Sequence, residues 1–257
     1  FSSTIVKMIF YFSATGNSKL IASYLSKSLQ LSALDMNQHD ITDFTSDNVV
    51  GLIFPVHAWG MPSVIKKYLP KIIPSLKRAS YIFVILCCGD DVGYCDIHVR
   101  KLLRKHNIEI SAIFSLNMPN TYIGIPGFDI DTSDIQNDKL LQAHDRLNEI
   151  TAIINQRKST TNVIRGSFAF LKSGPIRWLF NKFMINDAFF RVDSKLCTKC
   201  KQCAKVCPQN NITFTPYPKW NHNCLTCFAC FHACPHKAIK FKLSGREKGQ
   251  YKAPDSL

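Results

Sequence analysis

Eight of the eleven cysteines fall between positions 197 and 234, in two copies of one pattern. Each copy reads C-x2-C-x2-C-x3-C-P, and the cysteines are Cys197, Cys200, Cys203 and Cys207, then Cys224, Cys227, Cys230 and Cys234. An iron–sulfur cube needs four soft thiolate ligands, and the x2 spacing lets a tight loop wrap three of them around one cube. The fourth cysteine of each copy points elsewhere. The repeat therefore predicts two 4Fe–4S clusters.

Zinc and disulfides explain these cysteines less well. A zinc site would use two CxxC pairs for one tetrahedral ion, which leaves the other cysteines and the two prolines unexplained. A disulfide scaffold needs an oxidising compartment, but the apolar run Ile5 to Phe12 contains Lys7 and does not resemble a signal peptide. No run reaches the roughly 18 apolar residues of a membrane span. We therefore expect a soluble, cytoplasmic protein.

The first 156 residues alternate short apolar runs with amphipathic stretches, which is typical of βαβ units around a parallel sheet. This pattern predicts an α/β fold in which helices cover both faces of a doubly wound sheet. The five expected strands are Ile5–Phe12, Ala33–Met36, Val49–Phe54, Tyr81–Cys87 and Ile108–Leu116. The expected helices are Asn17–Leu29, Pro62–Ile73, Gly93–Lys105 and Ser133–Gln156, the last with Ser133 as N-cap.

Residues 157–186 differ in composition, with six basic and no acidic residues and several aromatic ones. We expect a helix from Pro175 to about Asn186, with Pro175 in its first turn. Its apolar stripe, Ile176, Leu179, Phe180, Phe183 and Met184, is predicted to pack between two domains. The alternative is that this basic amphipathic segment lies on an anionic membrane surface. The predicted division is thus residues 1–156, a connector at 157–186, and residues 187–257.

The net charge of +14 is confined to the C-terminal part of the chain. Residues 1–156 hold 14 basic and 14 acidic side chains, whereas residues 187–257 hold twelve basic and four acidic ones. Two oxidised clusters and a flavin phosphate would lower the total only to about +8. We therefore expect an acidic protein partner, and Lys195, Lys199, Lys201 and Lys205 around the first cysteine motif are the candidate docking charges.

The first predicted strand ends in a loop of small hydroxyl residues and glycine, followed directly by a helix. Backbone N–H groups and hydroxyls in such a loop converge on one anion. The loop resembles the flavodoxin fingerprint that holds the phosphate of FMN. That resemblance implies phosphate ligands at Ser13, Thr15, Gly16, Asn17 and Ser18.

The two following strand ends also resemble flavodoxin loops. The first, with Pro55, His57, Ala58, Trp59 and Gly60, would place Trp59 on the isoalloxazine ring. The second would wrap the other edge of the flavin with Cys88, Gly89, Asp90 and Gly93. A second stacking aromatic has only Tyr94 as a candidate, so the outer face of the flavin is expected to be open.

The cysteine half resembles bacterial two-cluster ferredoxins, in which the fourth cysteine of each motif ligates the other cube. This implies one cluster on Cys197, Cys200, Cys203 and Cys234, and a second on Cys207, Cys224, Cys227 and Cys230. The whole chain is similar to the fused flavodoxin–ferredoxin proteins of anaerobes, with a flavodoxin-like half followed by a small α+β ferredoxin-like domain. It departs from free flavodoxins and ferredoxins, which are usually acidic.

These observations predict an electron-transfer oxidoreductase that passes electrons between two 4Fe–4S clusters and FMN and exchanges them with a protein partner. Whether it is an enzyme stays open, because a flavin-dependent reductase of a quinone, tetrapyrrole or corrinoid would have the same parts. A third hypothesis is an iron or redox sensor that binds an anionic partner, although a nucleic acid is not expected. A carrier needs no pocket beside its flavin, whereas a reductase needs a cavity for its small-molecule acceptor.

Overall fold

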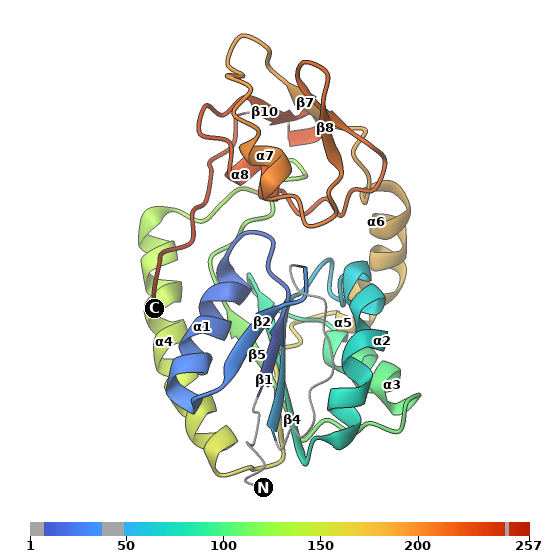
Figure 1. Cartoon of the computed structure of the whole chain (residues 1–257), viewed down its shortest axis with the longest axis vertical. Coiled ribbons are helices and arrows are strands. Elements are labelled where there is room, and N and C mark those ends of the chain that lie inside the picture. Colours follow the sequence, from blue (N-terminus) through green and yellow to red (C-terminus); the bar gives the residue numbers. More distant parts are fainter. Residues whose placement is uncertain (1–7, 38–48, 245–246) are drawn as a thin grey trace, which may run out of the picture.

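The computed structural model describes residues 8–37, 49–244 and 247–257. Within them, a six-stranded parallel sheet has the strand order β2-β1-β3-β4-β5-β6 (Figure 1). The strands are β1 Met8–Tyr11, β2 Ser32–Asp35, β3 Val49–Pro55, β4 Tyr81–Cys88, β5 Ala112–Asn117 and β6 Thr160–Asn162. The chain order switches direction between β1 and β3, so the carboxyl ends of these strands border a crevice where such sheets bind ligands.

Four helices cover the sheet on both faces. Helices α1 (Asn17–Leu29) and α4 (Ser133–Asn155) pack on one face, and α2 (Ser63–Arg78) and α3 (Cys95–Arg104) pack on the other. The central strands β3 and β4 are apolar and buried on both sides, which is why they read as continuous hydrophobic runs rather than alternating ones. The sheet therefore sits between two hydrophobic cores.

The predicted sheet is confirmed, with small differences at its edges. A sixth strand, β6, comes from the predicted connector and pairs with β5. Ile5 to Lys7 of the first expected strand lie outside the described residues. Ser133 is the first residue of α4 rather than its N-cap, and Thr132 precedes the helix without a capping side-chain hydrogen bond. The division at residues 156 and 186 stays a prediction.

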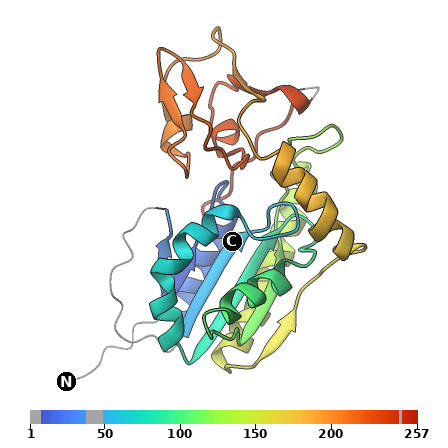
Figure 2. The ribbon, with the colours of Figure 1, turned by 90° about the vertical axis from the view of Figure 1, so that its right-hand side faces the viewer.

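The cysteine-rich half is small and lies beyond the carboxyl edge of the sheet (Figures 1 and 2). Its strands form two antiparallel pairs, β7 with β10 and β8 with β9, and phenylalanines from several segments fill one core between them. Its elements are β7 Phe190–Val192, α7 Gln202–Lys205, β8 Ile212–Phe214, β9 Pro218–Trp220, α8 Ala229–His232, β10 Ile239–Phe241 and the short 3-10 helix Lys242–Ser244.

The connector is helical, but it begins earlier than predicted. It consists of α5 (Ala169–Leu171), one π-helical turn (Lys172–Ile176) and α6 (Arg177–Phe183), so Pro175 lies inside the helical segment rather than in its first turn. The expected packing of its apolar stripe holds only for Phe180 and Met184, which are half-buried. The side chains of Ile176, Leu179 and Phe183 are 44%, 49% and 55% exposed.

The C-terminal tail returns from the cysteine-rich half to the sheet. The hydroxyl of Tyr251 donates to Oδ1 of Asn17 at 2.6 Å, and the buried Lys248 ammonium donates to the carbonyl of Phe128. Leu257 packs against the core beneath α1 and α4. The two halves are therefore tied by both the connector and the tail. None of the described helices combines the length and the apolar character needed to cross a bilayer.

Candidate functional site

The loop between β1 and α1 forms a tight turn around the start of the helix. Gly16 adopts φ 105°, a left-handed conformation that favours glycine, and its N–H donates to Oγ of Ser13 at 3.2 Å. The side chain of Asn17 donates to the carbonyl of Pro119 at 2.9 Å, and the hydroxyls of Thr15 and Thr121 lie 3.3 Å apart. The first N–H groups of the 13-residue helix α1 lack helical partners and make this end suited to an anion.

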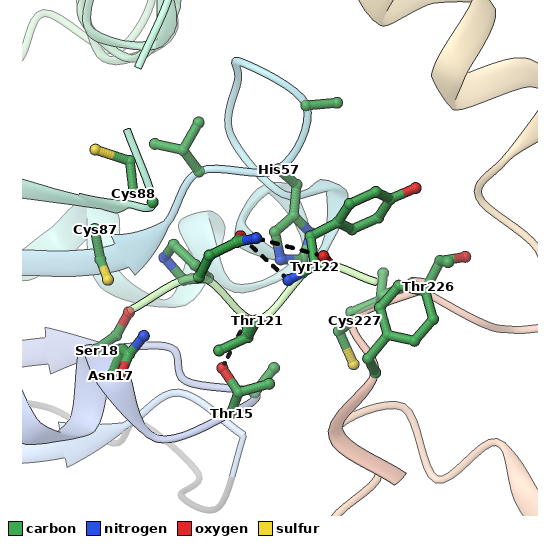
Figure 3. A pocket seen from close by; sticks show the side chains of 18 of the residues that line it. Thr15, Asn17, Ser18, His57, Cys87, Cys88, Thr121, Tyr122, Thr226 and Cys227 are labelled. Carbon is green, nitrogen blue, oxygen red and sulfur yellow. Dashed lines mark hydrogen bonds between the residues drawn. The ribbon is translucent and has the colours of Figure 1, made fainter. Parts of the chain in front are cut away.

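A cavity of about 140 Å³ lies beside this loop, at the carboxyl ends of β1, β3, β4 and β5 (Figure 3). The predicted residues that line it are Ser13, Thr15, Asn17, Ser18, Pro55, His57, Ala58, Cys88 and Gly89. They come from three loops far apart in the sequence, which the parallel sheet brings together because its strands all end at one edge. The structure thus assembles one pocket from the three predicted loops.

The loop after β5 also lines the pocket, although the sequence had not assigned it to the site. It contributes Pro119, Asn120, Thr121 and Tyr122. The hydroxyl of Tyr122 is buried without a hydrogen-bond partner among the described residues, and its ring packs edge-on against Phe128 and Phe228. An unpaired buried hydroxyl at a pocket wall fits a polar ligand that accepts or donates a hydrogen bond there.

Residues of the cysteine-rich half form the facing wall of the pocket. Leu225, Thr226, Cys227 and Phe228 line it, together with Phe180 and Ile185 of the connector region. Figure 3 shows Thr226 and Cys227 on the opposite side of the pocket from Asn17 and Ser18. The second half of the chain thus covers one side of the pocket, and the expected open outer face of the flavin stays a prediction.

Five predicted residues do not line the pocket: Gly16, Trp59, Gly60, Asp90 and Gly93. The indole of Trp59 lies beside the connector, with the Lys172 ammonium 5.7 Å from the ring centroid and the Ser173 hydroxyl donating to the Trp59 carbonyl. Ala58 and Trp59 both have left-handed backbones, with φ 44° and 55°. This turn directs the indole away from the pocket, so its predicted stacking role has no support from its position.

Arg177 of α6 holds the His57–Met61 loop in this conformation. Its guanidinium donates to the carbonyls of His57, Ala58 and Met61, the last two at 2.9 and 2.8 Å. A Cβ on Gly60 would overlap the guanidinium, so only glycine leaves room for this contact. Burial lowers the pKa of Arg177, with the nearby Cys95 opposing that shift. Arginine in the connector thus shapes one wall of the pocket.

The titratable side chains around the pocket are kept neutral. Burial, with a smaller contribution from Arg177, lowers the pKa of His57 to about 4. Burial also raises the pKa of Cys87 to about 12, an effect that a hydrogen bond with Ser18 partly offsets. Cys95, the first residue of α3, lies outside the pocket lining and has its pKa raised to about 12 by burial. The pocket is therefore lined by uncharged groups at neutral pH, and these cysteines serve packing rather than thiolate chemistry.

The first set of cysteines surrounds a small enclosed space. Cys197, Cys200, Cys203 and Cys234 line one cavity, together with apolar residues such as Phe214 and Ile239. The main-chain N–H of Ala238 points at Sγ of Cys234 at 3.2 Å. Three cysteines of one motif and the fourth of the other thus lie together, as the resemblance to ferredoxins predicts.

The second set lies closer to the pocket. Burial raises the pKa of Cys227 to about 12 and that of Cys224 to about 11, and Cys207 raises both further through its charge. The N–H groups of Asn211 and Thr226 point at Sγ of Cys207 and Cys224, at 3.3 and 3.2 Å. Such buried thiols with N–H donors fit ligands that are deprotonated by iron and stabilised by hydrogen bonds to sulfur.

Trp220 belongs to this second set of contacts. Its buried indole N–H has no nitrogen or oxygen partner among the described residues, and it lies beside the thiol of Cys230. No three His, Cys, Asp or Glu side chains in the described ranges are arranged to hold one single metal ion. Four thiols instead line one small space, and the four thiols of the second set lie close enough to interact, which is the donor set of an iron–sulfur cube.

Two family models match separate parts of the chain. A model of the flavodoxin domain matches residues 8–109, and a model of the 4Fe-4S dicluster domain matches residues 196–238. No curated protein matches the chain. Solved structures that resemble it include a Megasphaera elsdenii flavodoxin, with 16% identity, a TM-score of 0.36, and coverage of 43% of this chain and 85% of that one.

Two further solved structures match a larger share of this chain, also at low sequence identity. An FMN-dependent NADH-azoreductase from Bacillus anthracis is 11% identical, with a TM-score of 0.40, and the match covers 58% of this chain and 99% of that one. A Trp repressor binding protein from Bacillus subtilis is 10% identical, with the same TM-score of 0.40, and the match covers 56% of this chain and 96% of that one.

The sheet, the pocket and the cysteine sets define a flavin and iron–sulfur electron-transfer protein. The flavodoxin domain implies FMN, and the dicluster domain implies 4Fe–4S clusters. Within that class, this chain has a fused flavodoxin–ferredoxin architecture, with the flavodoxin domain first and the 4Fe–4S dicluster domain second.

Proposed function

We propose that this protein carries electrons between two 4Fe–4S clusters and one FMN, and exchanges them with a protein partner. One observation carries the proposal: Cys227, a predicted cluster ligand, lines the same pocket as the predicted FMN phosphate loop. The flavin site and one cluster site are therefore neighbours, with no other domain between them. FMN takes one or two electrons and each cluster takes one, so the combination links single-electron and two-electron partners.

The chain's own residues define the proposed flavin site. The β1–α1 loop, with Ser13, Thr15, Gly16, Asn17 and Ser18, would hold the phosphate through hydroxyls and the first N–H groups of α1. Gly89 faces Asn120, and a Cβ there would lie 3.3 Å from its side-chain oxygen, so a larger residue would crowd Asn120 in this wall of the proposed site. Pro55, His57, Ala58 and Cys88 form the remaining predicted contacts.

The cysteines divide between the two clusters as the resemblance implies. The distal cluster would be held by Cys197, Cys200, Cys203 and Cys234, and the proximal one by Cys207, Cys224, Cys227 and Cys230. Phe190, Phe228 and Trp220 pack in the core beside the cysteines, where they exclude water. Cys200 is exposed, so the distal cluster is the one that a partner can approach.

The lining of the pocket favours a carrier over a small-molecule reductase. Leu225, Thr226 and Cys227 of the cysteine-rich half face the loops of the sheet across the pocket. Its volume of about 140 Å³ lies below the roughly 300 Å³ of ordinary ligand pockets, so we infer that the two walls separate when FMN binds. A reductase would need a further cavity beside the flavin for its acceptor.

The docking surface is the basic rim of the distal cluster. Lys195, Lys199, Lys201 and Lys205 are all exposed around the first cysteine motif, and the Lys199 ammonium lies 5.0 Å from the ring centroid of Tyr217. An acidic redox protein would be steered to this rim. Such steering raises association rates about 10- to 1000-fold and weakens as the Debye length falls from about 10 Å at 0.1 M salt to 3 Å at 1 M.

Anaerobic stopped-flow measurements test the proposal. The dithionite-reduced holoprotein is mixed with an oxidised acidic ferredoxin at increasing ionic strength, and the second-order rate should fall steeply. Lys199→Glu with Lys201→Glu should flatten this dependence, whereas the matched charge reversal Lys66→Glu with Lys67→Glu on α2 should leave it unchanged. A salt-independent rate, or faster oxidation by a small quinone than by any protein, would favour the reductase hypothesis.

A further inference from the structure

The connector presents most of the exposed large apolar side chains of the described chain. Eight of the thirteen such residues lie between positions 164 and 183. Phe168 is 76% exposed, Phe170 67%, Trp178 59% and Phe183 55%. We call the following set the outer connector face: Phe168, Phe170, Leu171, Trp178, Leu179 and Phe183. A cluster of this size at the surface marks an interaction site rather than scattered exposure.

The polar side of the connector fixes this orientation. The Lys172 ammonium forms an ion pair with Asp91 at 2.6 Å, and the Ser173 hydroxyl accepts from the N–H of Tyr94 at 2.7 Å. Arg177, four residues after Ser173, donates hydrogen bonds to carbonyls of the His57–Met61 loop. Residues at i and i+4 share one helix face, so the side turned toward the flavodoxin half is polar and the outer side is apolar. Rotation of the apolar side inward would break all of these contacts.

Lys182 lies on the outer connector face, and further basic side chains lie beside it on helix α3, whereas Lys172 and Arg177 face the flavodoxin half. The Lys182 ammonium lies 5.0 Å from the ring of Trp178 and 5.3 Å from that of Phe183, so its stem covers apolar surface while its charge reaches solvent. Residues 157–186 contain six basic and no acidic residues. On the neighbouring helix α3, a basic groove is formed by Arg100, Lys101, Arg104 and Lys105 and reaches Arg165 of the connector.

Three acidic side chains lie in or beside this basic region, and each is paired, Asp91 with Lys172 as described above. Asp96 accepts two hydrogen bonds from Arg165, and Glu109 pairs with Arg104 at 2.9 Å. Helices α3 and α6 lie on the same side of the molecule (Figures 1 and 2). An apolar stripe with aromatic residues therefore lies beside a net positive surface.

From this arrangement we propose that the outer connector face binds the surface of an anionic lipid bilayer. Aromatic and leucine side chains on one side of a helix insert at the boundary between headgroups and acyl chains, and nearby Lys and Arg contact anionic headgroups. A protein partner or a second copy of this chain could cover the apolar side chains with an apolar patch of its own. Neither partner requires that residues 157–186 contain no acidic residue, whereas an anionic membrane favours such a segment. The protein would thus be a peripheral membrane protein with both halves in the aqueous phase.

Vesicle co-sedimentation of the holoprotein tests the proposal. Binding is expected to vesicles of phosphatidylcholine mixed with phosphatidylglycerol, with a partition coefficient that falls as salt rises and is much lower for pure phosphatidylcholine. Phe168→Ser with Trp178→Ser should lower the partition coefficient about tenfold or more, since two large apolar side chains no longer insert. The control Leu141→Ser, on α4 at the opposite side of the molecule, removes a side chain that is 64% exposed and should change nothing.

A fluorescence measurement keeps the test independent of folding defects. Brominated lipids should quench the tryptophan emission of the wild type, and Trp178→Phe should retain binding while losing most of this quenching. Absence of binding to anionic vesicles would overturn the proposal, as would equal binding by the double variant. Self-association in solution that the double variant abolishes, without vesicle binding, would overturn it too and would identify the face as a homodimer contact.

Discussion

The contact between Arg177 and the His57–Met61 loop gives the sharpest quantitative prediction. Arg177→Met keeps the length of the side chain but removes the guanidinium that donates to three carbonyls. A hydrogen bond of this kind contributes about 1 to 1.5 kcal/mol net when its acceptor can still reach water, so three contribute about 3 to 4 kcal/mol. The left-handed backbones of Ala58 and Trp59 each cost about 1 kcal/mol or more, so the loop is not expected to keep its conformation unaided.

The assay is titration of the apo-flavodoxin site with FMN, followed by quenching of flavin fluorescence. If the loop must reform before FMN binds, a 3 kcal/mol loss raises Kd about a hundredfold. Arg165→Met is the matched control, because Arg165 also belongs to the connector but pairs with Asp96 rather than with the loop. It should leave Kd within about twofold of the wild type.

A double-mutant cycle separates this contact from general destabilisation. Gly60→Ala places a Cβ where the guanidinium lies, so it should weaken FMN binding in the wild type. In the Arg177→Met background the flexible methionine can move aside, and the same substitution should cost much less. Additive effects of the two changes, or a wild-type Kd for Arg177→Met, would refute the reasoning.

Three further predictions concern the cofactors and the pocket. Cys207→Ala should remove the proximal cluster and spare the distal one, which iron counting with EPR would detect; loss of the distal cluster alone would contradict the crossover. Thr15→Ala with Ser18→Ala should raise the Kd for FMN at least about a hundredfold while iron content stays constant, since two hydroxyl donors to a charged phosphate are lost. Because the folded-state pKa of His57 is about 4, below the usual 6.5, its contribution to stability is complete above pH 6.5 and is lost as pH falls toward 4. Urea unfolding of the flavodoxin half should therefore show about 2 kcal/mol lost between pH 7 and pH 5, and His57→Gln should show a clearly smaller loss.

The local features of both halves could be predicted from the amino-acid sequence. The buried runs at 49–55 and 81–88 are apolar throughout because central parallel strands are covered on both faces, and both were predicted within one residue. Helix α1 was predicted with its observed bounds, since its apolar period and the preceding Gly16 are local signals. The two cysteine motifs are likewise local, because loop wrapping around a cube depends on spacing of a few residues.

Which of these features lie next to one another depends on how the chain folds in three dimensions. The loop with Thr121 and Tyr122 joins the pocket because the parallel strands end at one edge, and the sequence had not assigned this loop to the flavin site. Trp59 is an aromatic residue in the loop where a stacking side chain was predicted. Its position relative to the pocket depends on Arg177, which lies more than a hundred residues away in the sequence and holds the backbone of this loop. The closure of the pocket by Cys227 depends on how the second half docks.

The connector shows the same division between local and long-range information. Its amphipathic period is visible in the sequence, but the period alone does not say which side turns inward. Apolar burial favours the stripe of Leu179 and Phe183, and the sequence prediction rested on that preference. In the structure, Arg177 donates to three carbonyls of the His57–Met61 loop, and Lys172 pairs with the carboxylate of Asp91. The free energy gained by hydrogen-bonding these polar groups exceeds the free energy gained by burying the apolar stripe. This comparison applies only once the connector packs against the flavodoxin half.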